Sequence, residues 1–399
     1  MSAASARARG FRLIAGAWLL FGATLLCLLV LDLLLRVVLG DSATPSVKPS
    51  AAMPAREQMA ANGVRSASYW REHEQARHTA WRPYVYFRRL PFSGSQIAVD
   101  AHGFRQSAAA ARTFGEVWFF GGSVVWGTGV SDAQTLPSLT ALAWRGQTPR
   151  VLNFAESGYV TAQSHLSFAH ALRCQGAMPR LAVFVDGVND VFSALQSGRA
   201  GWPQNESNRV QEFNLSRRVD ALALAWLTRL KGLSALRSRL APSQLGWDAQ
   251  RVEGLAGQIV DAYLANIAQT RAIAAARGVP VLFVWQPSLF AKTQRAPDEQ
   301  SVLEASSSAH VALQLASDAE LARRLLQAPQ ADIVDLQRVF QPHAEPLYLD
   351  FAHLGPAGNQ LLIDALMPAL YDRVGPFAEP VQAAACSERP LATSVSAAL

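Results

Sequence analysis

The sequence contains few cysteines and few charged residues for its length. Of its 399 residues three are cysteines, no Cys-x-x-Cys motif occurs, and no cysteine–histidine spacing matches a zinc site. No metal or other cofactor is therefore expected. Charged residues make up 17% of the chain and hydrophobic residues 50%, so the chain can bury a sizeable core, as one large domain or two smaller ones.

The net positive charge is also small outside the N-terminal region. The formal net charge is +6, and four arginines against Asp32 place +3 of it in the first forty residues. The remaining +3 is spread along the rest of the chain. Nucleic-acid binding requires a concentrated basic face, so we expect no nucleic-acid partner.

An apolar run lies close to the N-terminus. Leu13–Leu31 is nineteen residues without a charge, which is long enough to span a bilayer as a helix. Three arginines and no acidic residue precede it, so its N-terminal end is expected on the cytoplasmic side. A cleaved signal peptide is the alternative, but its apolar region is normally shorter and ends in small residues, which Val38–Gly40 matches poorly. We expect residues 1–40 to be a cytoplasmic tip and an uncleaved anchor in the inner (plasma) membrane, with the main domain periplasmic or extracellular.

Two segments connect the apolar run to the main domain. Residues 41–61 are rich in Ser, Pro, Ala and Lys and are expected to form a solvated linker. In an N-terminal extension at 62–114, Tyr84–Phe92 and Ser95–Phe104 have the pattern of two strands joined by a Ser-Gly turn. The aromatic residues of this extension are Tyr69, Trp70, Trp81, Tyr84, Tyr86, Phe87 and Phe92. Exposed rings could stack on sugars and form a glycan platform, but large aromatics usually serve cores, so we favour a hairpin packed against the domain edge.

From residue 115 to 373 the sequence alternates between short apolar runs and helical patterns. The expected strands are Val117–Phe120, Arg150–Phe154, Leu181–Val185, Val279–Trp285 and Ala331–Leu336. The expected helices are Leu136–Trp144, Ala162–Cys174, Leu255–Arg277, Ser307–Gln327 and Pro356–Asp372. Several strands are apolar on both faces, as buried parallel strands are. The alternation predicts an α/β domain with a doubly wound parallel sheet, in which ligands bind at the carboxyl ends of the strands.

The sequence leaves alternatives for an insertion in this region and for two cysteines, and it also indicates the state of the C-terminal tail. The insertion 192–250 contains a basic amphipathic stretch, Asn214–Leu240, which could lie on a membrane surface, cover a site, or pack on the core with a solvated basic face. Cys174 and Cys386 could pair in an oxidising compartment or remain two free buried thiols. The tail 374–399 is expected to be loosely ordered.

The first predicted strand ends in a motif that can carry a nucleophile. Within Glu116–Asp132, the apolar run stops at Gly121-Gly122-Ser123, which is typical of a strand that turns sharply into a helix. Ser123 then lies at a helix N-terminus, where free N–H groups favour negative charge. An ordinary N-cap is the competing interpretation. The α/β-hydrolase motif Gly-x-Ser-x-Gly is excluded because position 125 is Val125.

Polar motifs follow other predicted strands as well. Asn153–Gly158 follows the second strand, Gly187–Asp190 the third, and Asp350–His353 the last. The order and spacing of these four motifs resemble the SGNH hydrolases, the GDSL-like lipases and acylhydrolases, over roughly residues 115–373. The resemblance implies a flavodoxin-like α/β fold. Together with the apolar run near the N-terminus, it indicates a membrane-anchored member of this superfamily.

The resemblance also implies roles for five residues. Ser123 matches the nucleophile, although Gly122 replaces the aspartate of the common Gly-Asp-Ser form. The backbone N–H groups of Ser123 and Gly158 and the side-chain amide of Asn189 match the oxyanion hole. His353 matches the general base and Asp350 its orienting carboxylate.

The chemistry of acyl transfer explains why these residue types occur together. A serine hydroxyl needs a neutral imidazole to accept its proton, and a carboxylate fixes the imidazole tautomer and stabilises the imidazolium. Hydrogen-bond donors already in place stabilise the oxyanion of the tetrahedral intermediate. Structural alternatives exist for each residue: Asn153 and Asn189 could only fix turns, Asp190 could only cap a helix, and Asp350 and His353 could be a surface pair. His165 and His170 are expected to be bystanders.

The sequence therefore predicts a serine esterase that cleaves a small acyl ester, acetate in particular, from a cell-envelope or exported glycan. The expected partners are an acylated small molecule or glycan and, through the N-terminal helix, the membrane. A polysaccharide O-acetyltransferase with the same serine and histidine is the first alternative. A non-catalytic glycan-binding or assembly component is the second, since fold alone does not decide function.

Overall fold

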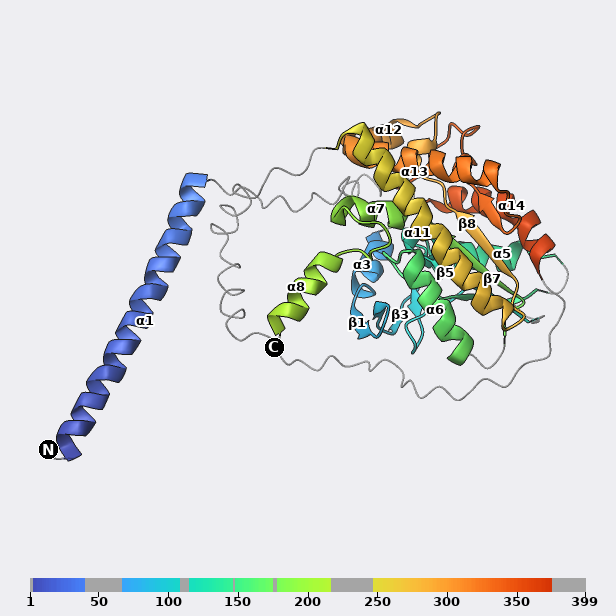
Figure 1. Ribbon diagram of the computed structural model, residues 1–399. Coiled ribbons are helices and arrows are strands. Elements are labelled where there is room, and N and C mark those ends of the chain that lie inside the picture. The colour runs from blue at the N-terminus through green and yellow to red at the C-terminus, as the bar shows by residue number, and fades with distance from the viewer. Residues whose placement is uncertain are drawn as a thin grey trace. The chain divides into compact units, whose positions relative to one another are not determined.

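The computed structural model describes residues 3–39, 67–107, 115–145, 148–174, 178–216 and 247–374 (Figure 1). The expected linker 41–61, most of the basic stretch Asn214–Leu240 and nearly all of the tail 374–399 lie outside the described residues. The chain divides into two units, one containing α1 and nearly all of α8 and the other containing the remaining described elements. Cys174 is disulfide-bonded, and Cys386 lies outside the described part.

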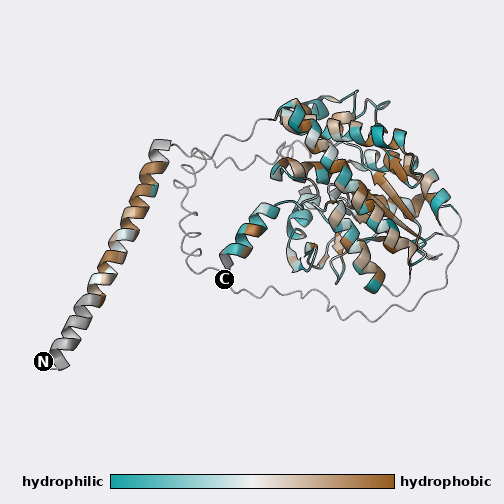
Figure 2. Ribbon diagram, in the orientation of Figure 1, coloured by the Kyte–Doolittle hydropathy of each residue, from teal (hydrophilic) through white to brown (hydrophobic). Residues whose placement is uncertain are grey.

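In the described part of the chain, two helices contribute to the first unit. These are α1 (Ala3–Leu39) and α8 (Glu206–Ser216). Within α1, Ile14–Leu35 has a mean hydropathy of 2.4 over 22 residues, and 6% of the window is buried. Figure 2 shows mostly hydrophobic residues along the coloured part of this helix. Its length and composition are compatible with a membrane anchor or with a signal sequence.

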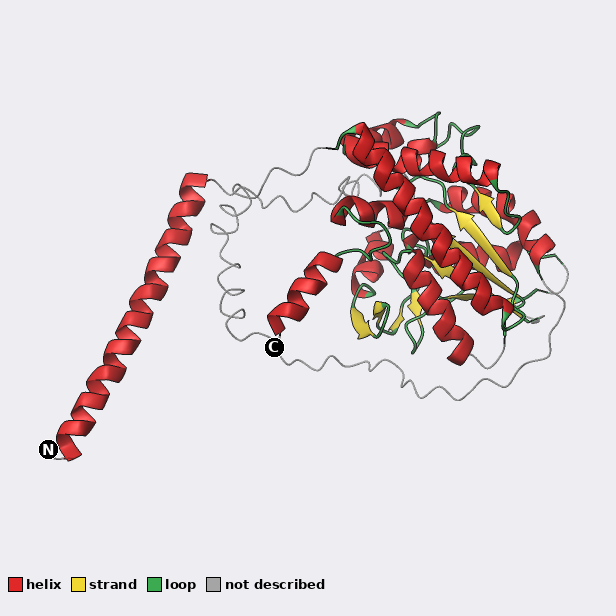
Figure 3. Ribbon diagram, in the orientation of Figure 1, coloured by secondary structure: helices red, strands yellow, loops and turns green. Residues whose placement is uncertain are grey.

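The second unit is built on a five-stranded parallel sheet with the strand order β6-β5-β7-β8-β9 (Figure 3). The strands are β5 (Glu116–Gly121), β6 (Arg150–Asn153), β7 (Leu181–Asp186), β8 (Val281–Trp285) and β9 (Ile333–Asp335). With these five strands numbered 1 to 5 along the chain, this is the flavodoxin-like 2-1-3-4-5 order, in which the direction of winding reverses at the first strand. The predicted doubly wound parallel sheet is confirmed.

Helices cover both faces of the sheet. The helices are α5 (Leu136–Ala143), α6 (Thr161–Cys174), α7 (Val188–Ser197), α11 (Ala249–Ala275), α12 (Pro297–Ala305), α13 (Ser308–Gln327) and α14 (Pro356–Arg373). Alternate strand residues point to opposite faces. Val117 and Phe119 therefore pack in one core with α5 and α14, whereas Trp118 and Phe120 pack in a second core with α6, α11 and α13.

The N-terminal extension differs from the single hairpin that the sequence predicts. After α3 (Ala67–Gln75), two short hairpins form: β1 (Thr79–Arg82) with β2 (Tyr86–Arg89), and β3 (Phe92–Ser93) with β4 (Ala98–Val99). Tyr84–Phe92 is therefore split, because its first half pairs with the preceding segment. Pro91 separates the two halves, and a proline cannot donate to a strand ladder.

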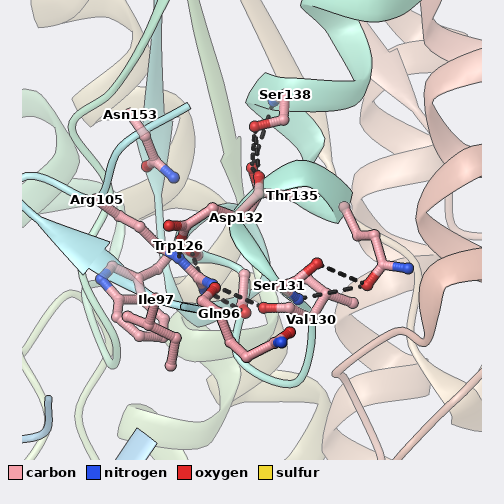
Figure 4. Close-up of polar contacts among 12 residues, drawn as sticks. Gln96, Ile97, Arg105, Trp126, Val130, Ser131, Asp132, Thr135, Ser138 and Asn153 are labelled. Atoms are coloured by element: carbon pink, nitrogen blue, oxygen red, sulfur yellow. Dashed lines mark hydrogen bonds and ion pairs between the residues drawn. The ribbon is translucent and has the colours of Figure 1, made fainter. Parts of the chain in front are cut away.

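A buried arginine ties this extension to the element that follows β5. Arg105, which is 1% exposed, donates to Asp132 Oδ1 at 2.7 Å and to the carbonyl oxygens of Gly127 and Val130 at 2.6 and 2.7 Å (Figure 4). Its guanidinium also lies 4.4 Å from the ring centroid of Trp126, within cation–π range. These contacts hold the loop after α4 (Ser123–Trp126) against the sheet.

Candidate active site

The four sequence motifs meet at the carboxyl edge of the sheet. Ser123 follows β5 as the first residue of α4, Gly158 lies in the loop after β6, and Asn189 lies in the first turn of α7 after β7. Asp350 and His353 precede α14. The winding of the sheet reverses beside β5, and doubly wound folds bind ligands at that point.

Two glycines allow the sharp turn into Ser123. Gly121 has φ +147°, and a Cβ there would collide with the carbonyl oxygen of Val185. A Cβ at Gly122 would overlap the amide nitrogen of Asn189. The absence of a side chain at position 122 therefore leaves room for the Asn189 amide in its observed position.

A hydrogen-bonded chain joins Ser123 to a buried carboxylate. The distance from Ser123 Oγ to His353 Nε2 is 2.7 Å, and that from His353 Nδ1 to Asp350 Oδ2 is 2.5 Å. The backbone N–H groups of Ala352 and His353 donate to Asp350 Oδ1 at 2.9 and 2.8 Å. Burial alone raises the pKa of Asp350, but His353 and these hydrogen bonds outweigh burial and hold the pKa below its ordinary value. An ionised Asp350 can fix the tautomer of His353, which leaves Nε2 free to accept the serine proton.

A buried ion pair holds the segment before Asp350. Lys292 and Glu299 are fully buried and lie 2.5 Å apart. Glu299 Oε1 accepts hydrogen bonds from the backbone N–H groups of Leu347 and Tyr348 at 2.9 and 3.0 Å, and Lys292 donates to the carbonyl oxygen of Glu345 at 2.6 Å. The charges are thus compensated by each other and by the backbone, as buried charges require. Sequence reasoning missed this pair, because lysine and glutamate at this spacing are typical of an exposed surface.

Asn189 lies between the other two candidate oxyanion donors. Its side-chain Nδ2 donates to the carbonyl oxygen of Tyr159 at 2.8 Å and lies against Gly122. Tyr159 directly follows Gly158, which has φ +80°, and Gly122 directly precedes Ser123. The amide therefore spans from the Ser123 loop to the Gly158 loop. The three candidate oxyanion donors therefore lie on neighbouring segments.

Gln204 is a further residue at this site that sequence reasoning missed. Its Nε2 donates to Asn189 Oδ1 at 3.3 Å, and its Oε1 lies 3.2 Å from the position that a Cβ on Gly158 would take. A glutamine in a loop after α7 has no motif to mark it, so only the folded chain reveals it.

Asp190 and Asn153 have structural contacts. Asp190 accepts hydrogen bonds from the backbone N–H and the hydroxyl of Thr161, the first residue of α6, at 3.1 and 2.9 Å. Burial raises its pKa to about 6 despite these hydrogen bonds. Asn153 donates to the carbonyl oxygen of Val125 at 3.0 Å and accepts from the N–H of Ala155 at 3.1 Å.

The predicted bystander histidines also have structural contacts. His165 is hydrogen-bonded to Thr270 at 2.9 Å, and His170 lies 3.3 Å from the Cys174 sulfur. Across the described part of the chain, no group of three or more His, Cys, Asp or Glu side chains is arranged to hold a metal ion.

A buried aspartate supports the start of α7 through Trp285. The Trp285 ring lies 2.8 Å from the position that a Cβ on Gly187, the N-cap of α7, would take. Its Nε1 donates to Asp318 Oδ1 at 2.8 Å, and Gln314 donates to the same oxygen at 2.8 Å. Burial raises the pKa of Asp318 to about 7, although both hydrogen bonds act to lower it.

We expect Asp318→Asn to reduce the pH dependence of stability. Between the unfolded pKa of about 4 and the folded pKa of about 7, only the folded state keeps the proton. The free energy of unfolding therefore falls as pH rises through this window, by about 1.4 kcal/mol per pH unit for this one group, and levels off above it. Thermal unfolding at pH 5 and pH 8 measures the difference.

The control for this experiment is Asp364→Asn, at an exposed aspartate of α14. The control should lose as much stability as the wild type between the two pH values, and Asp318→Asn should lose less. Equal losses in all three proteins would show that Asp318 does not hold its proton in the folded state.

Comparisons with known proteins bear on the fold. No protein-family model matches the sequence, and no curated protein sequence matches it. The chain is similar to the structure of a member of the lipolytic protein G-D-S-L family from Veillonella parvula, with 10% identity, a TM-score of 0.36, and coverage of 63% of this chain and 96% of that one. It is also similar to the acetyl xylan esterase AlAXEase (16% identity, TM-score 0.37, coverage 64% and 99%). A third similar structure is a catalytic mutant of an acetylxylan esterase from Geobacillus stearothermophilus (12% identity, TM-score 0.35, coverage 65% and 95%).

At these identities and TM-scores, the roles of individual residues rest on the geometry of this chain. The sheet has the strand order of a flavodoxin-like fold, and the candidate site lies at the carboxyl ends of its strands. The fold that the sequence resemblance implies is thus confirmed by the sheet of this chain.

Proposed function

We propose that this chain is a membrane-anchored serine esterase that removes a small acyl group, acetate, from a cell-envelope or exported glycan. The observation that carries the proposal is the continuous chain Ser123–His353–Asp350, with distances of 2.7 and 2.5 Å. Its geometry is suited to nucleophilic catalysis, in which the base is within hydrogen-bond reach of the nucleophile and is itself oriented by a third group.

The proposed reaction runs through an acyl-enzyme. Ser123 Oγ attacks the ester carbonyl while His353 Nε2 takes the serine proton, and His353 then gives this proton to the departing sugar oxygen as the ester C–O bond breaks. Water attacks the acyl-enzyme in the second half, again with His353 as base, and releases the free acid. In both halves the N–H groups of Ser123 and Gly158 and the Asn189 amide donate to the oxyanion.

The surroundings of the oxyanion site favour a short acyl group. Gln204 lies beside both Gly158 and Asn189, so a polar side chain borders the proposed oxyanion site. A long alkyl chain there would desolvate the glutamine amide without replacing its hydrogen bonds, which costs free energy.

The apolar window Ile14–Leu35 supports the membrane anchor, because it is long enough to span a bilayer and only 6% of it is buried. With three arginines before the window, the proposed orientation places the catalytic domain outside the cytoplasm. Cell fractionation tests the anchor, and we expect the full-length chain in the membrane fraction. Protease added from outside the cytoplasm tests the orientation, and we expect it to digest the catalytic domain.

The esterase is tested with the purified full-length chain in detergent and 4-nitrophenyl acetate as substrate. We expect release of 4-nitrophenolate and free acetate, with no acetyl group transferred when an unacetylated oligosaccharide is added. Acetylation of the oligosaccharide at the expense of free acetate would instead identify an O-acetyltransferase. No release of 4-nitrophenolate above the uncatalysed rate would favour a non-catalytic glycan-binding or assembly component.

A further inference from the structure

Two large aromatic side chains are exposed in the β1–β2 hairpin, Trp81 in β1 and Tyr84 in the turn. Trp81 is 66% exposed and Tyr84 is 80% exposed, whereas Tyr69 and Trp70 of the same extension are buried. The Trp81 ring also packs against Tyr86, with centroids 5.5 Å apart at an angle of 38°. Tyr84 belongs to the turn that joins the strands of these two rings, and we call the three residues the aromatic turn (Trp81, Tyr84 and Tyr86).

The backbone of the aromatic turn is strained. Tyr84 and Tyr86 have φ +67° and +75°, a region that glycine or asparagine adopts far more readily than a bulky residue. The N–H of Val85 donates to the carbonyl oxygen of Pro83 at 2.8 Å, so Tyr84 is the central residue of a γ-turn with left-handed φ, a rare and strained form. Packing does not explain an aromatic residue at Tyr84, because most of its surface faces solvent. Strained residues of this kind cluster at ligand-binding sites.

The aromatic turn is fixed directly to the loop that carries Gly158. Tyr159 Oη donates to the carbonyl oxygen of Phe87 at 2.5 Å, and Gln163 Nε2 donates to that of Val85 at 2.8 Å. Arg89 donates to Ser157 Oγ at 3.0 Å. The turn therefore stands beside the loop that supplies a candidate oxyanion donor.

A second connection runs through the loop that carries Gln204. Tyr86 Oη donates to Glu206 Oε1 at 3.1 Å, and Glu206 lies two residues after Gln204, which contacts Asn189 and Gly158. The hairpin of the aromatic turn thus contacts two loops that also belong to the candidate oxyanion site: the loop that carries Gly158 and the loop that carries Gln204.

We infer that the aromatic turn is a sugar-binding subsite that holds a ring of the glycan carrying the ester. A pyranose ring offers C–H groups that pack on an aromatic face and hydroxyls that reach polar neighbours, and the turn combines exposed rings with the Glu206 carboxylate. This inference rests on the proposed function for its substrate class. It revises the sequence prediction of a merely packed hairpin, because Trp81 and Tyr84 are exposed.

The kinetic test compares a glycan ester with a small ester, using the full-length chain in detergent. The substrates are partially O-acetylated oligosaccharides with xylan, glucomannan and alginate backbones, and 4-nitrophenyl acetate. We expect Trp81→Ala and Tyr84→Ala to lower kcat/KM for the best oligosaccharide about tenfold each, through KM. Hydrolysis of 4-nitrophenyl acetate should be unchanged, and Tyr84→Phe should retain activity on both because it keeps the ring.

Two further variants separate binding from stability. Tyr84→Asn suits the left-handed backbone, so it should keep or raise the melting temperature while losing activity on the oligosaccharide. Leu326→Ala, at a side chain of α13 that is 84% exposed, should change neither activity. Equal losses on both substrates, or no loss on the oligosaccharide, would overturn the subsite.

A binding titration separates failure of the subsite from failure of the proposed function. In a Ser123→Ala background, isothermal titration with the same oligosaccharides should show binding that Trp81→Ala weakens about tenfold. This result would support the subsite even if the wild-type chain cleaved no ester. Failure of every oligosaccharide to bind, or equal Kd values with and without Trp81, would reject the subsite while leaving hydrolysis of 4-nitrophenyl acetate as evidence for the esterase.

Discussion

Replacing Ser123 with alanine is expected to lower kcat for ester hydrolysis by about 10⁴–10⁶-fold. The substitution removes the oxygen that would form the acyl-enzyme, while the N–H group of residue 123 remains available to an oxyanion. Ser123 Oγ is hydrogen-bonded to His353, and an alanine fits the same space with one atom fewer. Folding should therefore be preserved, and the thermal unfolding midpoint should stay within a few degrees of the wild type.

The measurements are kcat with 4-nitrophenyl acetate and covalent labelling by a fluorophosphonate, which reacts with activated serines. Ser301→Ala is the matched control, because it also removes one hydroxyl, from an exposed position of α12. The control should keep both activity and labelling. A Ser123→Ala protein that retains most of its activity, or is still labelled, would contradict the proposed nucleophile.

Replacing Asn189 with alanine is expected to lower kcat by about 10²–10³-fold with little change in KM. The amide of Asn189 lies against Gly122 and bonds to Tyr159, between the two backbone donors. A hydrogen bond from this amide strengthens as negative charge develops on the carbonyl oxygen, so its loss falls mainly on the chemical step. Asn189→Asp should be at least as harmful, because it places a carboxylate where negative charge forms.

Asn153→Ala provides a control at another strand-end asparagine. The Asn153 side chain bonds to Val125 and Ala155, so its loss should lower stability while the folded fraction keeps a near-normal kcat. Active-site titration corrects each rate for the active fraction. If Asn189→Ala changed only KM, or behaved like Asn153→Ala, Asn189 would be a turn residue and the oxyanion assignment would be wrong.

Many of the elements could be predicted from the sequence because their signals are local. The strands β5, β7 and β8 are apolar runs that end at glycines or polar residues, and their predicted bounds differ from the observed ones by two residues or fewer. Helix α7 was not predicted, because it is short and begins within the motif Gly187–Asp190. The composition of that motif is also typical of a turn.

The pairing of the N-terminal extension could not be predicted correctly. Tyr84–Phe92 has the composition of one strand, yet the left-handed φ values of Tyr84 and Tyr86 and the position of Pro91 divide it. Composition indicates that a segment can form a strand, but the choice of partner depends on which backbone groups another segment presents.

The sequence by itself determined the order of the strands along the chain, the glycine-flanked Ser123, and the identity of the residues at each strand end. Only the tertiary structure brought Ser123 within 2.7 Å of His353, 230 positions later in the sequence. The tertiary structure also revealed Gln204, the Lys292–Glu299 pair and the aromatic turn. The reason is physical: periodicity and turn chemistry act over a few residues, whereas these contacts depend on how the sheet and its loops pack, which no local pattern encodes.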